Sequence, residues 1–327
     1  MPLVEFTEKG FYVPQADCYI DPEKKVPTAI ITHGHSDHAR RGCGKYYATP
    51  LTASIIKFRY SISKCETFEF NEAFEINGVQ FSFHPAGHVA GSAQVRIEYR
   101  GEVWVITGDY KRAVDRVCKT FEVVPCDHFV TECTFGMPIY RWKSETELTE
   151  QIRDWWVENQ KNYRASLLMG YSLGKAQRLM QMIEDPIGPI YCHPTVYETN
   201  EVIAQHGIPF HENKILDGIQ SFDDLSQSLI IAPGSAVRSD WAKSIGDFSP
   251  ASASGWNQTR RRRRGQADRH FVISDHADWP ELIQTVHETG AHHIYVMHGF
   301  TETFGAHLRD LGFDAQTVSH RLNQSSI

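Results

Sequence analysis

The segment 26–38, VPTAIITHGHSDH, places three histidines and one aspartate directly after a short apolar run. The apolar run predicts a buried strand, and Gly34 permits a sharp turn where that strand ends. Imidazole nitrogens and carboxylate oxygens are ligands that a zinc-like ion prefers, and burying several of them without a shared partner is costly. The pattern therefore predicts a metal site built from His33, His35, Asp37 and His38. The alternative is a polar loop in which Ser36 or Asp37 caps a helix.

Size and cysteine usage place the chain among ordinary globular proteins. It has 327 residues, 41% of them hydrophobic and 22% charged, which is enough for one large or two modest domains. The seven cysteines are scattered and include no CxxC pair, so we expect reduced and mostly buried thiols. Cys133 is expected to serve packing.

Charge and hydropathy limit the kinds of partner that the chain can bind. No window approaches the roughly 20 apolar residues that span a bilayer, and the first residues lack the layout of a signal peptide. We therefore expect a cytoplasmic protein with no membrane partner. The net charge of −7 argues against coating of nucleic acid by bulk electrostatics. Any such contact needs a local patch, and Arg260, Arg261, Arg262, Arg263 and Arg264 offer one, unless they form a solvated loop.

Further polar residues follow other predicted strands. The region from Phe68 to Asp109 reads as β-rich, with a hairpin turn at Arg100-Gly101. His88 and Asp109 each come after a strand and a glycine, and Glu132 ends the run DHFVTEC. Taken singly, such residues are more often turn or capping groups. Because loops at one edge of a sheet meet in space, together they can complete a metal site.

The pattern changes after Ser144. A helix is predicted over 145–161, followed by alternating strand and helix signals that imply a parallel sheet flanked by helices. We expect a second, small α/β domain over 138–268. At its strand-to-helix junctions GYSLGKAQR and APGSAVR, backbone N–H groups and polar side chains could hold phosphates, or the junctions could be plain turns. The side chains concerned are Ser172, Lys175, Ser235 and Arg238.

The last 60 or so residues again show the pattern of the first domain, in which polar residues directly follow predicted strands. HFVISDHADW is a strand that ends in Asp275 and His276, a helix is expected over 280–288, and HHIYVMHG is a strand that ends in His298. We expect residues 269–327 to complete the domain formed by residues 1–137.

These motifs, in this order, resemble those of the metallo-β-lactamase superfamily. HGHSDH resembles its HxHxDH signature, and PAGHVAGSA and GDY resemble its next two motifs. The acidic strand end at Glu132, with His276 and His298, resembles the β-CASP branch, whose members process nucleic acids. The resemblance implies an αββα metallo-β-lactamase sandwich with an inserted β-CASP α/β cap domain. Within that branch the chain looks most similar to bacterial ligase-associated DNA exonucleases.

The resemblance implies two divalent metal ions, with zinc favoured and manganese an alternative. One ion would take His33, His35 and His88, the other Asp37, His38 and His298, with Asp109 shared. Asp21 would orient the histidines from behind, although opening an Asp-Pro turn is its alternative role. Water between two such ions has its pKa lowered from about 15.7 toward 7, which makes hydroxide available.

The catalytic residues implied are Asp109 and His276, the latter as the acid that protonates the departing sugar oxygen. Glu132 and Asp275 are candidates for orienting His276 or its neighbours. The leading hypothesis is a metal-dependent DNA exonuclease that works in repair with a DNA ligase and a helicase. A ribonuclease of the mRNA 3′-end-processing or RNase J-like kind is the first alternative, because His298 is typical of RNA-processing members. A small-molecule thioesterase or lactamase and a catalytically inactive scaffold are the others.

Overall fold

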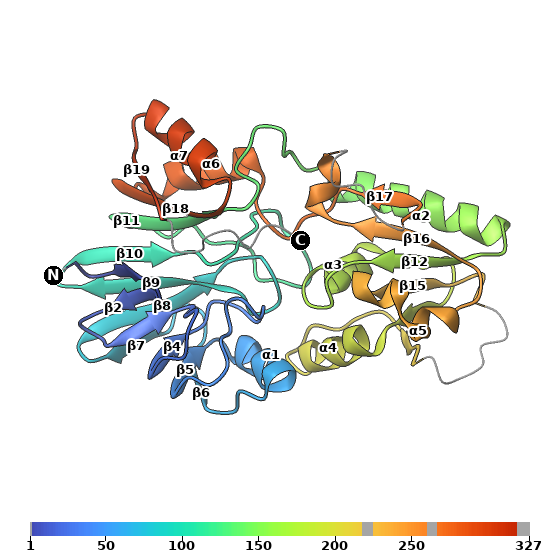
Figure 1. The fold of residues 1–327 in the computed structure, drawn as a ribbon, viewed down its shortest axis with the longest axis horizontal. Helices are drawn as coiled ribbons and strands as arrows, with labels where there is room; N and C mark the ends of the chain where they lie inside the picture. Colours follow the sequence, from blue (N-terminus) through green and yellow to red (C-terminus); the bar gives the residue numbers. More distant parts are fainter. Residues whose placement is uncertain (1, 218–224, 260–266, 319–327) are drawn as a thin grey trace. The chain divides into compact units, whose positions relative to one another are not determined.

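The computed structural model describes residues 2–217, 225–259 and 267–318. The chain folds as two compact units (Figure 1): unit 1 comprises Met1–Arg141 and His276–Ile327, and unit 2 comprises Trp142–Asp275. The sequence placed the inserted domain at 138–268. The observed unit begins later because the Tyr140 carbonyl accepts a hydrogen bond from Trp279 N–H in unit 1, and it ends later because strand β17 (Arg269–Phe271) pairs with unit 2.

Unit 1 contains two sheets. The first runs in the order β1-β2-β3-β4-β5-β6, and the second in the order β19-β18-β11-β10-β9-β8-β7. The first comprises Glu5–Thr7, Gly10–Val13, Cys18–Ile20, Thr28–Ile30, Lys45–Ala48 and Cys65–Thr67. The second comprises β7 Ala73–Ile76, β8 Val79–Pro85, β9 Ala93–Tyr99, β10 Glu102–Ile106, β11 His128–Cys133, β18 His293–Gly299 and β19 Asp314–Thr317. The predicted Arg100-Gly101 turn joins β9 to β10, and both of its residues have positive φ, as a tight hairpin requires.

The two sheets face each other across one apolar core, and helices cover both outer faces. Alternate residues of a strand serve different layers: Ile30 packs between the sheets, whereas Ala29 and Ile31 pack outward beneath helix α1 (Pro50–Tyr60). In the second sheet Val130 faces the central core and Phe129 faces helices α6 (Trp279–Thr289) and α7 (Thr301–Asp310). Figure 1 shows α6 and α7 at the top of this unit and α1 beside the strands β4, β5 and β6. This is the expected αββα arrangement.

Two helices of unit 1 begin with a side-chain cap. The Thr49 hydroxyl caps α1 by accepting from Thr52 N–H. Helix α6 begins with a capping box in which Asp278 and Glu281 each accept a backbone N–H of the other. The second cap fixes the backbone two residues after His276.

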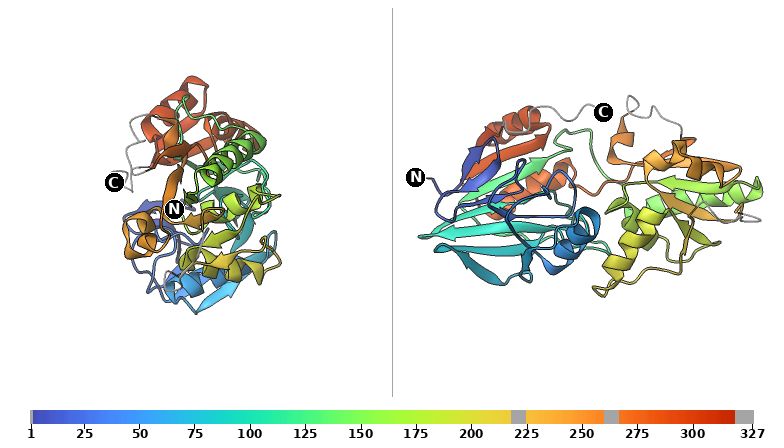
Figure 2. Two further views of the ribbon diagram at one scale, coloured as in Figure 1. Left: turned by 90° about the vertical axis from the view of Figure 1, so that its right-hand side faces the viewer. Right: turned by 60° about the horizontal axis from the view of Figure 1, so that its bottom comes forward.

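Unit 2 contains one sheet in the order β14-β13-β15-β12-β16-β17, and all its pairs are parallel. Helices α2, α3 and α4 pack on one face, and helix α5 with the 3₁₀ turn η1 packs on the other. The fold class is the α/β cap predicted, and the views in Figure 2 allow its helices to be followed around the sheet. The bounds are α2 Glu145–Lys161, β12 Ala165–Met169, α3 Lys175–Met182, β13 Ile190–Cys192, α4 Pro194–Ala204, β14 Lys214–Ile215, β15 Leu229–Ala232, η1 Gly234–Arg238, α5 Asp240–Lys243, β16 Phe248–Ala253, η2 Gly255–Gln258 and β17 Arg269–Phe271.

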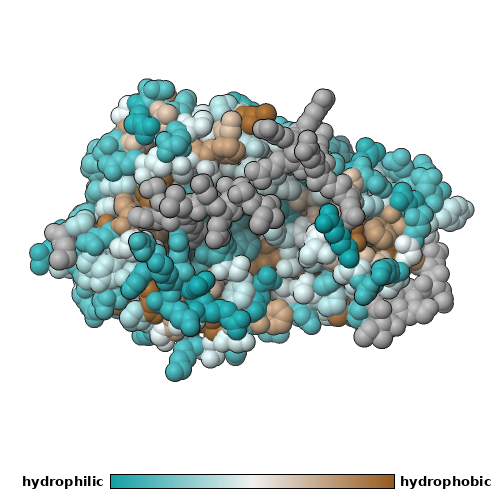
Figure 3. Space-filling view, in the orientation of Figure 1, coloured by the Kyte–Doolittle hydropathy of each residue, from teal (hydrophilic) through white to brown (hydrophobic). Residues whose placement is uncertain are grey.

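All seven cysteines are free, as expected. The expectation that most are buried was wrong, because only Cys18, Cys133 and Cys192 are buried and the other four are partly exposed. Within the described ranges, no helix combines the length and apolarity needed to cross a bilayer. The described residues on the face drawn in Figure 3 are mostly hydrophilic.

A buried ion-pair network ends unit 2. Asp275 accepts from Lys175 Nζ at 2.9 Å and from Arg178 Nη1 at 2.8 Å, and all three side chains are almost completely buried. Burial lowers the pKa of Lys175, and the neighbouring Asp275 carboxylate opposes that shift. The network ties the first turn of α3 to the segment just before His276.

Replacing Lys175 with methionine should lower the free energy of unfolding by about 3 kcal/mol, because it leaves a buried carboxylate with one cation instead of two. Urea unfolding followed by tryptophan fluorescence measures this, since Trp155 and Trp156 lie in the core of unit 2. The control is Lys243→Met, which removes an exposed ion pair with Asp240 and should change little. Equal stability of both variants would contradict a structural role for the network.

Candidate metal centre

Seven imidazole and carboxylate residues, predicted from separate strand ends, meet at one edge of the unit 1 sandwich. The HGHSDH loop follows β4 of the first sheet. His88 follows β8 and Asp109 follows β10, while His298 lies at the end of β18, all in the second sheet. The centre is therefore assembled from both sheets.

The first group of ligands converges around His35. Its Nδ1 lies 3.1 Å from His33 Nε2 and 3.2 Å from His88 Nε2. Asp109 Oδ2 lies 3.6 Å from His33 Nε2 and 3.7 Å from His88 Nε2. One atom from each of these four residues falls within 4.8 Å of all the others, which is compatible with one shared cation.

The second group is His38, Asp109 and His298, again with their ligand atoms within 4.8 Å of one another. Asp109 Oδ2 lies 3.5 Å from His38 Nε2, and Oδ1 lies 3.7 Å from His298 Nδ1. Asp37 stands at the rim, with its side chain 64% exposed and Oδ2 at 3.7 Å from His38 Nε2. Asp109 thus belongs to both groups, as a carboxylate that bridges two ions would.

Two buried atoms of this centre test whether a cation fits. Within the described part of the chain, His38 Nε2 and Asp109 Oδ1 are buried and have no hydrogen-bond partner. Leaving a buried lone pair unsatisfied costs about 1–3 kcal/mol, and more for a charged group. A divalent cation between them would satisfy both atoms, so the donor set fits a metal.

The electrostatics favour the metal-binding forms of His33 and Asp109, whereas His38 favours its protonated form and would give up that proton to a cation. Burial, reinforced by the neighbouring His38 and His88, lowers the pKa of His33, which keeps its lone pair available. Burial also opposes charge on His38, but Asp109 and Asp21 outweigh it and raise the His38 pKa to about 10. Burial alone would raise the pKa of Asp109, but the adjacent histidines, His38 first, hold it well below its usual value. Asp109 is therefore anionic, and positive charge is favoured beside it.

Asp21 holds the loop from behind, in a buried position. Its Oδ2 lies 2.6 Å from His38 Nδ1, which turns the Nε2 of that imidazole toward Asp109. Its Oδ1 accepts from Thr32 N–H at 2.9 Å, and its Oδ2 accepts from the Thr32 hydroxyl at 2.6 Å. The same hydroxyl lies 3.0 Å from His33 Nδ1. Of the two roles considered for Asp21, these contacts favour orientation of the histidines.

A β-bulge places His298. Strand β18 pairs with β11 residue for residue up to Met297 opposite Glu132, and then Cys133 pairs with Gly299, so His298 is the extra residue. His298 has φ +55°, a left-handed conformation that a non-glycine residue adopts at a cost. Gly299 follows with φ +85°, and a Cβ there would lie 2.3 Å from the Cys133 carbonyl oxygen. The bulge aims the imidazole at Asp109.

His276 stands beside the metal groups and is held by Glu132. Its Nδ1 lies 2.8 Å from Glu132 Oε1, and that oxygen also accepts from Tyr110 N–H. The other Glu132 oxygen accepts from Thr134 N–H at 3.1 Å. The backbone therefore fixes the carboxylate, and the carboxylate orients the ring. Asp109, Glu132 and His276 also bring ligand atoms within 4.8 Å of one another.

Other predicted site residues belong to unit 2 or lie outside the described residues. Asp275 pairs with Lys175 and Arg178 in unit 2, and its part in orienting His276 or its neighbours stays a prediction. Lys175 is buried in the same network, which leaves its ammonium unsuited to a phosphate. Ser172, Ser235 and Arg238 line a pocket in unit 2. The run from Arg260 to Arg264 lies outside the described residues.

Two contributors were not predicted from the sequence. Thr32 links Asp21 to His33, and the Ser92 hydroxyl accepts from the His88 N–H at 3.0 Å. A hydroxyl residue directly before the first ligand was the available signal for Thr32. For Ser92 the signal was a serine four residues after His88, a spacing that lets a hydroxyl close a tight loop.

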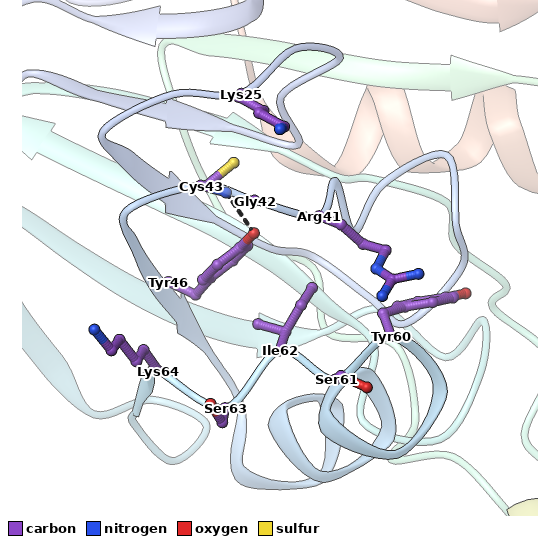
Figure 4. A pocket seen from close by; sticks show the side chains of 10 residues that line it. All are labelled: Lys25, Arg41, Gly42, Cys43, Tyr46, Tyr60, Ser61, Ile62, Ser63 and Lys64. Atoms are coloured by element: carbon purple, nitrogen blue, oxygen red, sulfur yellow. Dashed lines mark hydrogen bonds between the residues drawn. The ribbon is translucent and has the colours of Figure 1, made fainter.

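A basic pocket of about 400 Å³ is lined by residues 41–43, which follow the HGHSDH loop, together with Lys25, Tyr46 and residues 60–64 (Figure 4). Two of its tyrosines support the loop backbone: Tyr60 donates to the Gly34 carbonyl at 3.0 Å, and Tyr46 donates to the Arg40 carbonyl at 2.7 Å. Its ten lining residues include three cations and no carboxylate, so the pocket favours an anion. The cations are Lys25, Arg41 and Lys64.

The chain is similar in sequence to proteins whose names refer to the joining or cleavage of nucleic acids. A protein named "Probable DNA ligase" from Opitutus terrae is 27% identical over 314 residues, which is 94% of this chain and 30% of that protein. Endoribonuclease YSH1 from Kluyveromyces lactis is 36% identical over 129 residues, covering 38% of this chain and 16% of the relative. Cleavage and polyadenylation specificity factor subunit 3-I from Arabidopsis thaliana is 23% identical over 289 residues, covering 70% and 41%.

The chain spans less than half the length of each of these relatives. No family model matches it. Among solved structures, a protein of unknown function from Enterococcus faecalis V583 superimposes with a TM-score of 0.58 at 13% identity, covering 84% of this chain and 76% of that one. This last likeness concerns the fold alone.

Asp109→Ala should abolish both metal retention and phosphodiester cleavage, because it removes the only carboxylate common to both ligand groups described here. Metal analysis after purification with added zinc or manganese, together with an oligonucleotide cleavage assay, measures the two losses. Asp310→Ala, at the exposed end of α7, is the matched control and should behave like the unmodified protein. Near-normal cleavage by Asp109→Ala would refute the shared-carboxylate assignment.

Proposed function

Because the chain belongs to the β-CASP branch of the metallo-β-lactamase superfamily, we propose that it is a metal-dependent DNA exonuclease. The observation that carries this proposal is the placement of Asp109 between two groups of histidines, with His276 and Glu132 alongside. A lone metal with three ligands would suit many hydrolases. A pair of ions sharing one carboxylate suits in-line displacement at a phosphodiester.

The chain's residues divide into those that hold cations and those that move protons. His33, His35 and His88 would hold one divalent ion, and His38, His298 and Asp37 the other, with Asp109 between them. When bound, the ions supply an activated water and offset the charge that develops on the phosphate. Zinc suits the imidazole-rich set, and manganese is the alternative.

His276 is proposed as the general acid for the leaving sugar oxygen. The Glu132 carboxylate accepts from Nδ1 at 2.8 Å, so the tautomer and the ring orientation are set. The same carboxylate stabilises the imidazolium form, in which Nε2 carries the proton to be donated. Glu132 is thus a positioning residue and His276 the catalytic one.

DNA is favoured over RNA by the extent of similarity. The likeness to the protein named "Probable DNA ligase" extends over 94% of the chain, whereas the likeness to Endoribonuclease YSH1 covers 38%. A DNA ligase, with a helicase, is accordingly the proposed partner in repair. The alternative is a ribonuclease, which the printed name of that second relative favours.

Matched single-stranded DNA and RNA oligonucleotides, each labelled at one end, should separate these two functions. We expect the DNA to be shortened from an end, nucleotide by nucleotide, in the presence of zinc or manganese, and the RNA to be cut more slowly. Faster cutting of RNA, or cuts at internal positions only, would replace the proposal with the ribonuclease alternative. Asp109→Ala serves as the inactive control for contaminating nucleases.

His276→Ala should retain the metal but slow DNA hydrolysis on the order of 10²-fold or more, because it removes proton donation to the leaving oxygen. Bis(p-nitrophenyl) phosphate provides the sharper comparison, since nitrophenolate departs without needing a proton. The variant should lose much less activity on that substrate than on DNA. Equal losses on both substrates, or loss of metal, would show that His276 is not the general acid.

A further inference from the structure

Two neighbouring parallel strands of unit 2 send the chain to opposite faces of their sheet. Strands β12 and β15 pair in parallel, from Ser166 opposite Leu229 to Met169 opposite Ala232. After β12 the chain enters α3, whose apolar residues pack on one face, and after β15 it enters η1 and α5, which pack on the other. In open parallel sheets such a divergence opens a crevice beyond the carboxyl ends of the strands, where ligands bind.

A pocket of about 660 Å³ occupies this position. Its walls come from the residues that directly follow three adjacent strands: 170–172 after β12, 233–238 after β15 and 254–257 after β16. Every lining residue belongs to unit 2. None of the metal ligands is therefore among its lining residues, and its volume is in the range typical of small-ligand sites.

The lining combines flat aromatic surfaces with hydroxyls and one cation. Tyr171, Trp256 and His270 provide the rings, and the Tyr171 side chain is 67% exposed. Ser172 and Ser235 provide hydroxyls on two of the walls, and Arg238 provides a guanidinium. No carboxylate is among the lining residues. Aromatic rings stack on nucleobases, and arginine with hydroxyls binds phosphate oxygens.

The base of the pocket is already ordered by hydrogen bonds. The Ser252 hydroxyl lies 2.9 Å from His270 Nδ1, and Asn257 Nδ2 donates to the Ser252 carbonyl at 3.0 Å and to the Phe271 carbonyl at 2.9 Å. The Ser254 hydroxyl accepts from the Trp256 backbone N–H at 3.3 Å. Strands β16 and β17 thus hold η2, which carries Trp256, in place. A platform ordered in advance loses less entropy when a base stacks on it.

We propose that this pocket binds one unstacked nucleotide of a single-stranded nucleic acid, with the base against Tyr171 or Trp256 and a phosphate at Arg238. The inference rests on the proposed nuclease function and deepens it, because it makes single strands the substrate class. A base that remains paired inside a duplex has no free face to offer these rings. The preference for single strands then resides in residues of unit 2.

The test is binding of a fluorescent, phosphorothioate-linked single strand to the full-length protein, measured by anisotropy in the presence of zinc. Tyr171→Ala should weaken binding about tenfold, and Tyr171→Phe, which keeps the ring, should restore most of it. Arg238→Gln should also weaken binding about tenfold. The controls are Tyr163→Ala, at a tyrosine that is 81% exposed outside the pocket lining, and Arg153→Gln on the surface of α2.

Unchanged affinity in both Tyr171→Ala and Arg238→Gln would overturn the proposal. So would equal weakening for a hairpin duplex without single-stranded ends, because stacking on an unpaired base would then not be the cause. A loss in Arg238→Gln alone, with Tyr171→Ala unaffected, would also reject the nucleotide site in favour of a plain phosphate contact.

Failure of this inference can be told apart from failure of the proposed nuclease. Hydrolysis of bis(p-nitrophenyl) phosphate by the unmodified protein reports on the metal centre alone, since that substrate has no base to stack. If the unmodified protein hydrolyses this substrate but the pocket variants bind the single strand with unchanged affinity, the pocket proposal is rejected and the phosphodiesterase activity is retained. The absence of hydrolysis of any phosphodiester would reject the nuclease itself.

Discussion

The structure of unit 1 depends on a carboxylate in a buried position. Asp109 lies within reach of His33, His38, His88 and His298. Nearby histidines, His38 first and then His276 and His33, hold the pKa of its carboxyl well below its usual value. A buried anion needs compensation, and here the compensation comes from both sheets of the sandwich. Gly108 lets the loop approach closely, because a Cβ there would lie 2.6 Å from the Thr32 hydroxyl oxygen. The two sheets are therefore joined by a polar edge as well as by their apolar core.

The positions of the ligands follow from strand geometry. A strand holds the backbone rigidly, and the first residues after it inherit that rigidity while escaping the ladder of backbone hydrogen bonds. His33, His88 and Asp109 occupy such positions, and Glu132 and His298 occupy the end of a strand pair that a bulge distorts. Substitutions in the loops around such a centre can change the surroundings of the ligands without disturbing the two sheets.

Much of this was predictable from the sequence, because the pattern was local. HGHSDH, the glycines before His88 and Asp109, and the helix from 145 to 161 are signals carried by neighbouring residues. The ion pairs of Asp275 could not be predicted from the sequence because its partners, Lys175 and Arg178, lie about a hundred residues earlier, and no local pattern shows a buried ion pair of that kind. The pairing that carries unit 2 on to Asp275 has a similar cause: β17 reads as a strand in the sequence, but not as a partner of β16. The pocket in unit 2 needs the strand order, which motif reading alone does not supply.

Because of the bulge at His298, the position of this imidazole depends on the number of residues in β18. Side chains alternate between the two faces of a strand, so losing one residue anywhere from His293 to Met297 would shift the strand's register by one. Glu132 would then oppose the histidine in a regular ladder while Cys133 stays opposite Gly299, and the imidazole would lose the backbone turn that aims it at Asp109. Substitutions in β18 can therefore be neutral where a single-residue deletion is not. Related chains with very different sequences should still keep one residue between the position equivalent to Met297, which pairs with Glu132, and the position equivalent to Gly299.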